Sequence, residues 1–302
     1  MLWADRLREI LRQKLEAFFS LEESVLAGEE PEAIHDMRVA SRRLQEVLQL
    51  VFAEAPRLPG LIRVIRRARR VQSRVRDLDV MAEHLDSMAK GATADARKTL
   101  RFVQKAMGVR RRRRHQKMAE ALKSLDLGGL CADLEGLMAT GLGEGPDPGS
   151  GSALTRTQVA LRARARIAER TDAFQKAVST ARDSLGPDDL HLARITGKRL
   201  RYILETSDEL QIGSFRRRIE PMRAIQQALG HWHDLEVLEE TATGLLADRD
   251  VFRRRLPLVR AGCELIAGWR AEKAAHVQTF LKLTEGESSG RIASGPSRRA
   301  KG

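Results

Sequence analysis

Residues 34–48 read IHDMRVASRRLQEVL, and residues 190–204 read LHLARITGKRLRYIL. The two stretches align at an offset of 156 residues and share basic as well as apolar positions. The identical positions are a histidine, two arginines and two leucines: His35/His191, Arg38/Arg194, Arg43/Arg199, Leu44/Leu200 and Leu48/Leu204. Because the apolar residues recur at three and four positions, each copy is predicted to be an amphipathic helix.

A second pair of motifs follows the two copies in the same order. Residues 76–80 read RDLDV and residues 233–237 read HDLEV, at an offset of 157 residues. Chance likeness between amphipathic helices could produce one such match. Two matches in the same order and nearly the same register favour an internal duplication with a small insertion or deletion. We therefore expect two similar helical halves that pack with a pseudo-twofold relation.

Glycine and proline gather in two places and divide the chain. Residues 141–153, which include GLGEGPDPGSG, are predicted to be a linker, and residues 285–302 are predicted to be a disordered tail. The remaining sequence predicts one four-helix bundle over residues 1–140 and another over residues 154–284. We expect helices near 3–27, 31–54, 58–88, 93–124, 127–140, 155–185, 188–210, 214–246 and 250–283, with starts signalled by Pro31, Pro59 and Pro187.

The composition is strongly basic and rich in arginine. Lys and Arg outnumber Asp and Glu by 54 to 41, and only 11 of the 54 are lysine. Codon bias in a GC-rich genome would produce this excess, and so would a surface for oxyanions, because a guanidinium donates two hydrogen bonds to one phosphate. Aromatic residues form 4% of the chain. This scarcity argues against a single-strand nucleic-acid binder, which usually stacks bases on aromatic rings.

Cysteine content and the N-terminal residues bear on the compartment. The two cysteines, Cys131 and Cys263, exclude a cysteine zinc site and suit a reducing compartment. Residues 1–9 carry four charged side chains and do not resemble a signal peptide. No apolar run approaches the ~20 residues of a membrane span. We expect a soluble cytoplasmic protein without a membrane partner.

The duplicated motif places its basic residues on one side of a helix. At about 100° per residue, the histidine and the following cations share a face that lies opposite the leucines. This face contains His35, Arg38 and Arg42, with Arg43 on its flank, in the first copy, and His191, Arg194, Lys198 and Arg201 in the second.

The segment after the first motif is more basic still. Residues 55–76 contain eight arginines and no acidic residue. On a helix, five of them fall within an arc of ~100°: Arg63, Arg66, Arg67, Arg70 and Arg74. A face that only meets solvent usually mixes acids and bases, because like charges at i,i+4 repel by a few tenths of a kcal/mol per pair. We predict that this face meets a polyanion.

Two other charged groups allow more than one interpretation. The run Arg110–Arg114 covers every side of a helix, and it either extends the basic surface or is a solvated stretch. Asp77 and Asp79 follow the basic segment, and Asp234 and Glu236 are their counterparts. Asp77 and Asp234 are predicted to hold arginines through charge-assisted hydrogen bonds, with a metal-binding or acid–base role as the alternative.

The motif HDMRVASRRL at residues 35–44, followed by RDLDV at residues 76–80 and by a second copy of both, resembles the CHAD family (conserved histidine α-helical domain). The resemblance covers roughly residues 3–283. The second copy departs from the first at Gly197-Lys198, where the first has Ser41-Arg42. It also has His233 in place of Arg76.

This resemblance implies an all-α protein of two four-helix bundles around a basic central groove or pore. It implies non-catalytic binding of inorganic polyphosphate, and it allows association with polyphosphate granules, as in some members of the family. We expect no cofactor and no metal. The resemblance also allows association with a separate polyphosphate-metabolising enzyme. Catalysis in the family usually comes from an attached triphosphate-tunnel (CYTH) domain, for which this sequence has no room, so we expect no enzyme activity. The resemblance assigns phosphate binding to His35, Arg38, Arg42, Arg43, His191, Arg194, Lys198, Arg199 and Arg201, and the helix-face argument adds Arg63, Arg66, Arg67, Arg70 and Arg74.

Two other classes of function stay open. Net charge permits a basic helical protein that binds nucleic acid, although no zinc finger or RRM signature is present. The dipeptides His35-Asp36 and His233-Asp234 are of the kind that helical metal-dependent phosphohydrolases use. His231 and His233 fall ~200° apart on a helix and cannot share an ion. No phosphate-cradling P-loop occurs in the sequence.

Overall fold

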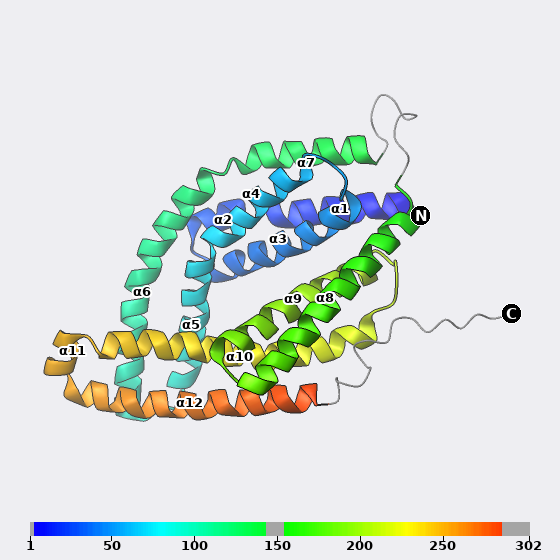
Figure 1. Cartoon of the computed structure of the whole chain (residues 1–302). Helices are drawn as coiled ribbons and strands as arrows, with labels where there is room; N and C mark the ends of the chain where they lie inside the picture. The colour runs from blue at the N-terminus through cyan, green and yellow to red at the C-terminus, as the bar shows by residue number, and fades with distance from the viewer. Residues whose placement is uncertain (1–2, 143–153, 286–302) are drawn as a thin grey trace. The chain divides into compact units, whose positions relative to one another are not determined.

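The computed structural model describes residues 3–142 and 154–285, and all regular elements within these ranges are α-helices (Figure 1). The first seven are α1 (Trp3–Phe19), α2 (Glu22–Ala27), α3 (Pro31–Val51), α4 (Leu58–Val71), α5 (Ser73–Ala89), α6 (Ala94–Lys123) and α7 (Leu127–Gly141). The others are α8 (Arg156–Ser184), α9 (Pro187–Glu209), α10 (Arg216–Leu246), α11 (Arg249–Arg254) and α12 (Leu256–Thr284). Apart from residues 141, 142 and 285, the predicted linker and tail lie outside the described residues. None of the described helices has the length and apolar character needed to cross a membrane.

The nine predicted helices are confirmed, three of them as pairs of shorter helices. The breaks fall at residues 20–21, at Gln72 and at Arg255. The break at Gln72 coincides with a fully buried side chain, whose Nε2 donates to the Sδ of Met37 at 3.2 Å. Pro31 and Pro187 begin α3 and α9 as predicted, because the fixed φ of proline suits a first helical turn.

The described chain divides into two compact units. The first contains the residues up to Val159 together with Glu236–Trp269, and the second contains Ala160–Leu235 and the residues from Arg270 onward. The boundaries therefore fall inside α8, α10 and α12. This division differs from the expected pair of consecutive bundles, because the end of α10, α11 and the first half of α12 belong with the N-terminal residues.

Contacts between distant segments show why residues 236–269 belong to the first unit. The indole Nε1 of Trp269 donates to the Sδ of Met88 at 3.1 Å. The hydroxyl of Thr99, on α6, donates to the carbonyl oxygen of Leu258, on α12, at 3.2 Å. A long amphipathic helix such as α10 gives no sequence signal of a change of unit along its length.

Helix α3 forms the centre of the packing in the first unit. It contacts α1, α2, α4 and α5. Its fully buried side chains recur at helical spacing and include Ile34, Met37, Leu44, Leu48 and Leu50. Removing each such side chain from water stabilises the fold by roughly 2 kcal/mol. This packing fixes the rotation of α3 and so the direction in which its basic residues point.

Helix α9 has the corresponding role in the second unit, with a buried stripe formed by Leu190, Ala193, Leu200, Ile203 and Leu204. Gly197 lies against the ring of Phe174, where an added Cβ would come within 3.0 Å of Cε2. The same Cβ would lie 3.5 Å from the Cε of Met222. The second copy of the motif therefore has a packing reason for glycine where the first copy has Ser41.

Candidate functional site

The clearest cluster of exposed cations lies on α4 and the first turn of α5. We call it the α4–α5 arginine face, and it consists of Arg63, Arg66, Arg67, Arg70 and Arg74. All five side chains are exposed, whereas the other side of α4 is buried through Leu61, Ile62, Ile65 and Ala68. Within residues 3–142 and 154–285, none of the five forms an ion pair with a carboxylate. The sequence-based prediction of an unbalanced basic face agrees with this arrangement.

Two other arginines hold α4 against α3. The Nη2 of Arg69 donates to the Oε1 of Gln45 at 3.1 Å, and its Nη1 lies 3.4 Å from the hydroxyl of Ser41. The Nη1 of Arg38 donates to the carbonyl oxygen of Arg69 at 2.6 Å and to the hydroxyl of Ser73 at 2.9 Å. Arg38, which the motif assigns to phosphate binding, therefore anchors the α4–α5 junction, where carbonyl groups at a helix end need donors.

His35 and the neighbouring cations lie at the surface of the first unit. His35 and Arg42 are half-buried and Arg43 is exposed. Burial lowers the pKa of His35, and the positive charges of Arg76 and Arg42 lower it further, against the opposing charges of Glu32 and Asp36. The imidazole is therefore neutral at pH 7, in an environment that already repels added positive charge.

In the second unit, the motif histidine contacts another histidine. The ring centroids of His191, on α9, and His233, on α10, are 4.9 Å apart. Burial and the charges of Arg194 and His191 lower the pKa of His233 to about 4. Burial and Arg194 also lower the pKa of His191. Lys198 adds to the positive potential at both rings, so this group attracts anions while its histidines stay neutral.

The remaining predicted cations of the second unit are partly balanced by acids. The Nε of Arg201 lies 3.7 Å from the Oε1 of Glu205, and the Nη2 of Arg223 lies 3.8 Å from the same oxygen. Arg199 is exposed, and its carbonyl oxygen accepts a hydrogen bond from Arg170 at 2.8 Å. The α4–α5 arginine face has no equivalent here, because the aligned positions are Glu220, Arg223, Ala224, Gln227 and His231.

Asp79 makes the buried ion pair that follows the basic segment. Its side chain is 2% exposed, and its Oδ1 accepts from the Nε of Arg111 at 2.5 Å. Asp77, which we predicted as the structural acid, is exposed. Asp234 is half-buried, and its charge raises the pKa of His233. Helical spacing could have identified Asp79, because it lies four residues after the buried Val75 and so on the apolar face of α5.

The run Arg110–Arg114 has two roles that the sequence left open. Arg111 points inward, and its Nη1 also donates to the carbonyl oxygen of Gly28 at 3.2 Å. One turn later, the Nε2 of His115 lies 3.0 Å from the carbonyl oxygen of Val25. These two side chains fix α6 against the end of α2. The other four arginines of the run are exposed.

The two copies of the motif make similar local contacts. In the first unit, Arg69 contacts Ser41. In the second, the aligned residue Gln226 donates through Nε2 to the carbonyl oxygen of Gly197 at 2.9 Å. The charge of Arg76 lowers the pKa of His35 in the first unit. The aligned residues of the second unit are His233 and His191, whose rings are in contact.

Three side chains of the first unit could offer ligands to a metal ion. The side chains of Glu32, His35 and Asp36 bring ligand atoms within 4.8 Å of one another. The Nη1 of Arg76 lies 3.5 Å from the Oε1 of Glu32, so a guanidinium already neutralises part of this cluster. The ring centroids of His231 and His276, on α12, are 5.2 Å apart, whereas His233 contacts His191, on α9, so the two histidines of α10 contact different helices.

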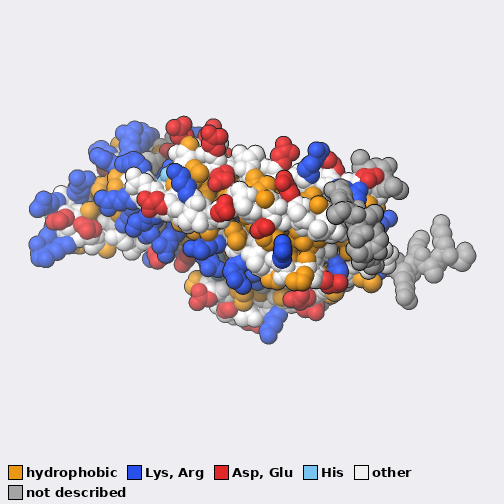
Figure 2. All heavy atoms as spheres, turned by 90° about the horizontal axis from the view of Figure 1, so that it is seen from above, with side chains coloured by type: hydrophobic (Ala, Val, Ile, Leu, Met, Phe, Trp, Pro, Cys, Tyr) orange, Lys and Arg blue, Asp and Glu red, His pale blue; other side chains and the backbone are white. Residues whose placement is uncertain are grey.

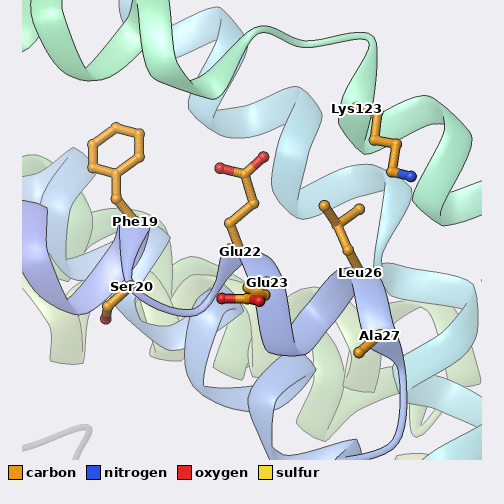
Figure 3. Close-up of a pocket in the computed structure, with 7 residues that line it drawn as sticks. All are labelled: Phe19, Ser20, Glu22, Glu23, Leu26, Ala27 and Lys123. Atoms are coloured by element: carbon orange, nitrogen blue, oxygen red, sulfur yellow. The ribbon is translucent and has the colours of Figure 1, made fainter.

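A separate hollow of about 660 Å³ lies between the α1–α2 connection and the end of α6 (Figure 3). Its walls carry Glu22 and Glu23, and Lys123 is the single cation among the lining residues. The two carboxylates would repel a polyanion, so this hollow is separate from the arginine face in chemical character.

These observations define an all-helical protein with an arginine-rich surface suited to anions. The family model for the CHAD domain matches residues 9–243, and the chain belongs to the CHAD domain family. Among solved structures, it is similar to the CHAD domain from the plant Ricinus communis, with a TM-score of 0.67 and 23% identity over 93% of this chain and 90% of that one. It is also similar to PptA from Streptomyces chartreusis, with a TM-score of 0.62 and 17% identity over 93% of this chain and 98% of that one. No match is found among curated proteins.

Proposed function

We propose that this protein binds inorganic polyphosphate and does so without catalysis. The observation that carries the proposal is the α4–α5 arginine face, whose five exposed guanidinium groups have no carboxylate partner within the described residues. Arg63, Arg67, Arg70 and Arg74 follow one another at steps of three or four residues, which corresponds to roughly 5 Å along a helix, and Arg66 lies next to Arg67. A linear chain of phosphates can therefore meet one guanidinium after another, while the face offers no aromatic ring for a base.

The histidine groups support the same ligand. The pKa values of His35, His191 and His233 are lowered by burial and by neighbouring cations. A bound polyanion would reverse the local potential and raise these pKa values, so binding would recruit further positive charge. We also propose that the chain arose by internal duplication of a four-helix unit, which the aligned contacts of Arg69 and Gln226 support. Association with polyphosphate granules and with a separate polyphosphate-metabolising enzyme belongs to the same proposal.

Calorimetric titration with long-chain polyphosphate tests the arginine face. The variant R63Q/R67Q/R70Q is expected to bind roughly ten- to a hundredfold more weakly. Its affinity should also depend less on salt, because fewer phosphate contacts form and fewer counterions are released on binding. The matched control is R12Q/R216Q/R260Q, which removes the same charge from three exposed arginines that already pair with Glu9, Asp208 and Glu264. Equal weakening in both variants would show that net charge alone attracts the ligand.

Competition with DNA distinguishes polyphosphate binding from nucleic-acid binding. DNA at equal phosphate content should not displace polyphosphate, and stronger binding of DNA would move the function to nucleic acid. Release of phosphate from polyphosphate in the presence of Mg²⁺ would contradict the non-catalytic assignment. In that case E32Q would be the first variant to examine, because Glu32 belongs to the cluster with His35 and Asp36.

A further inference from the structure

Two large apolar side chains of the first unit face water at the turn between α10 and α12. Phe252 is 55% exposed and Leu256 is 60% exposed. Pro257, the next residue, is exposed as well. They belong to α11 and its junction with α12, where the chain reverses (Figure 1). Exposed apolar side chains of this size on one short segment are a feature of surfaces that contact a membrane or another protein.

Exposed cations surround these side chains, and together they form what we call the α11 tip: Phe252, Leu256 and the four arginines Arg249, Arg253, Arg254 and Arg255. Two acids stand near them. Asp248 accepts hydrogen bonds from the backbone nitrogens of Asp250 and Val251, and Asp250 lies 3.9 Å from Arg254. Asp248 is therefore occupied as a helix cap, and the tip keeps a net positive charge.

Helix α6 extends the positive surface beside the tip. The guanidinium of Arg255 lies 5.4 Å from the ring centroid of Phe102, which places the tip against α6. Between Asp95 and Glu120, α6 contains no acidic residue, and it carries the exposed cations Arg101 and Lys105. Figure 2 shows Lys and Arg side chains gathered over the part of this unit where α11 lies, with only a few acidic side chains among them.

We propose that the α11 tip binds the surface of a lipid bilayer that contains anionic phospholipids. The arginines would meet the headgroup phosphates, and Phe252 and Leu256 would enter the boundary between headgroups and acyl chains. Free polyphosphate has no apolar part to cover these two side chains. A stable protein partner would need about 800 Å² on each side, which is more than a six-residue helix and its flanks provide. The expectation of no membrane partner rested on the absence of a spanning segment, which a surface contact does not need.

Vesicle flotation of the full chain tests this proposal independently of the proposed function. Vesicles of phosphatidylcholine with about 30% phosphatidylglycerol should bind the protein at least roughly tenfold better than phosphatidylcholine alone, because arginines are drawn to the anionic surface. The variant F252S/L256S should lower binding to the anionic vesicles by roughly tenfold, because no apolar side chain then enters the interface. Both residues are exposed, so circular dichroism should show an unchanged helical fold.

A matched control removes two other exposed apolar side chains. Leu161 and Leu192 are 57% and 48% exposed on α8 and α9, and L161S/L192S should float as the wild type does. Titration of F252S/L256S with polyphosphate in free solution should give the wild-type affinity. The proposal is overturned if F252S/L256S floats normally, if the control loses binding equally, if both vesicle types bind alike, or if the wild-type chain binds neither. Failure of the polyphosphate titration in the wild type would refute the proposed function alone.

Discussion

Acid should destabilise this protein through His233. Its pKa is lowered to about 4, first by burial and then by the charges of Arg194 and His191. The same imidazole in the unfolded chain has a pKa of about 6.5. Between these values the unfolded chain binds a proton that the folded chain does not. The contribution of His233 to the free energy of unfolding is therefore fully present above about pH 6.5, and it is lost progressively as the pH falls toward about 4.

The size of the loss follows from the two pKa values. A difference of about 2.5 between pKa values corresponds to about 3 kcal/mol when it is fully expressed. His233 is only half-buried, and contact of its ring with solvent reduces the expected loss to about 1–2 kcal/mol. The lowered pKa values of His191 and His35 act with the same sign.

Urea denaturation followed by circular dichroism measures this effect between about pH 7.5 and 4.5. Many carboxylates also titrate in this range, so the informative quantity is the difference between wild type and H233Q. H233Q should lose about 1–2 kcal/mol less stability over the acidic half of the range. Saturating polyphosphate should reduce the acid loss of the wild type, because a bound polyanion raises the pKa of His233. Parallel pH profiles for wild type and H233Q would refute this reasoning.

Three substitutions test other contacts by the free energy of unfolding in urea. G28A should lose about 2 kcal/mol or more of the free energy of unfolding, because Gly28 has a φ of 74° and an added Cβ would collide with the imidazole ring of His115. A loss under about 0.5 kcal/mol would contradict this prediction. D79N should lose about 2–3 kcal/mol, because the partly buried guanidinium of Arg111 would lose its carboxylate partner. D77N, at an exposed position, should lose less than about 0.5 kcal/mol. Equal losses in the two variants would show that Asp79 has no special structural role. G197A should lose about 1–2 kcal/mol through overpacking against an aromatic ring, and wild-type stability would show that the ring can move aside.

Helix positions could be predicted because amphipathic periodicity records which side of each helix is buried. The breaks within the predicted helices were harder to predict, because there is no glycine or proline at residues 20–21 or at residue 72. The break at Arg255 had a usable signal in Pro257, which lies in the first turn of α12 and favours a new helix start. The grouping of residues 236–269 with the N-terminal unit depends on tertiary packing alone, so no local pattern announces it.

The arginine face could be predicted for a similar reason. A helix with arginine on one side and isoleucine, leucine and alanine on the other can bury only one of these sides, which leaves the guanidinium groups in solvent. The roles of individual cations were not predictable from composition. Arg38 and Arg69 point into the contact between α3 and α4, where each binds a group of the other helix, and composition does not show this. Arg111 differs from the rest of its run by lying on the same face as the buried Met107 and Met118.

The division of α8, α10 and α12 between two units has a consequence for any attempt to take the protein apart. A fragment that ends at residue 142 would lack Trp269 and Leu258, so Met88 and Thr99 would lose the partners that they contact. Cleavage between residues 142 and 154 of the folded chain should instead leave two pieces that remain associated, because residues 236–269 keep their place in the first unit. The protein is thus a candidate for split-protein complementation, in which separately made halves restore the fold only when mixed.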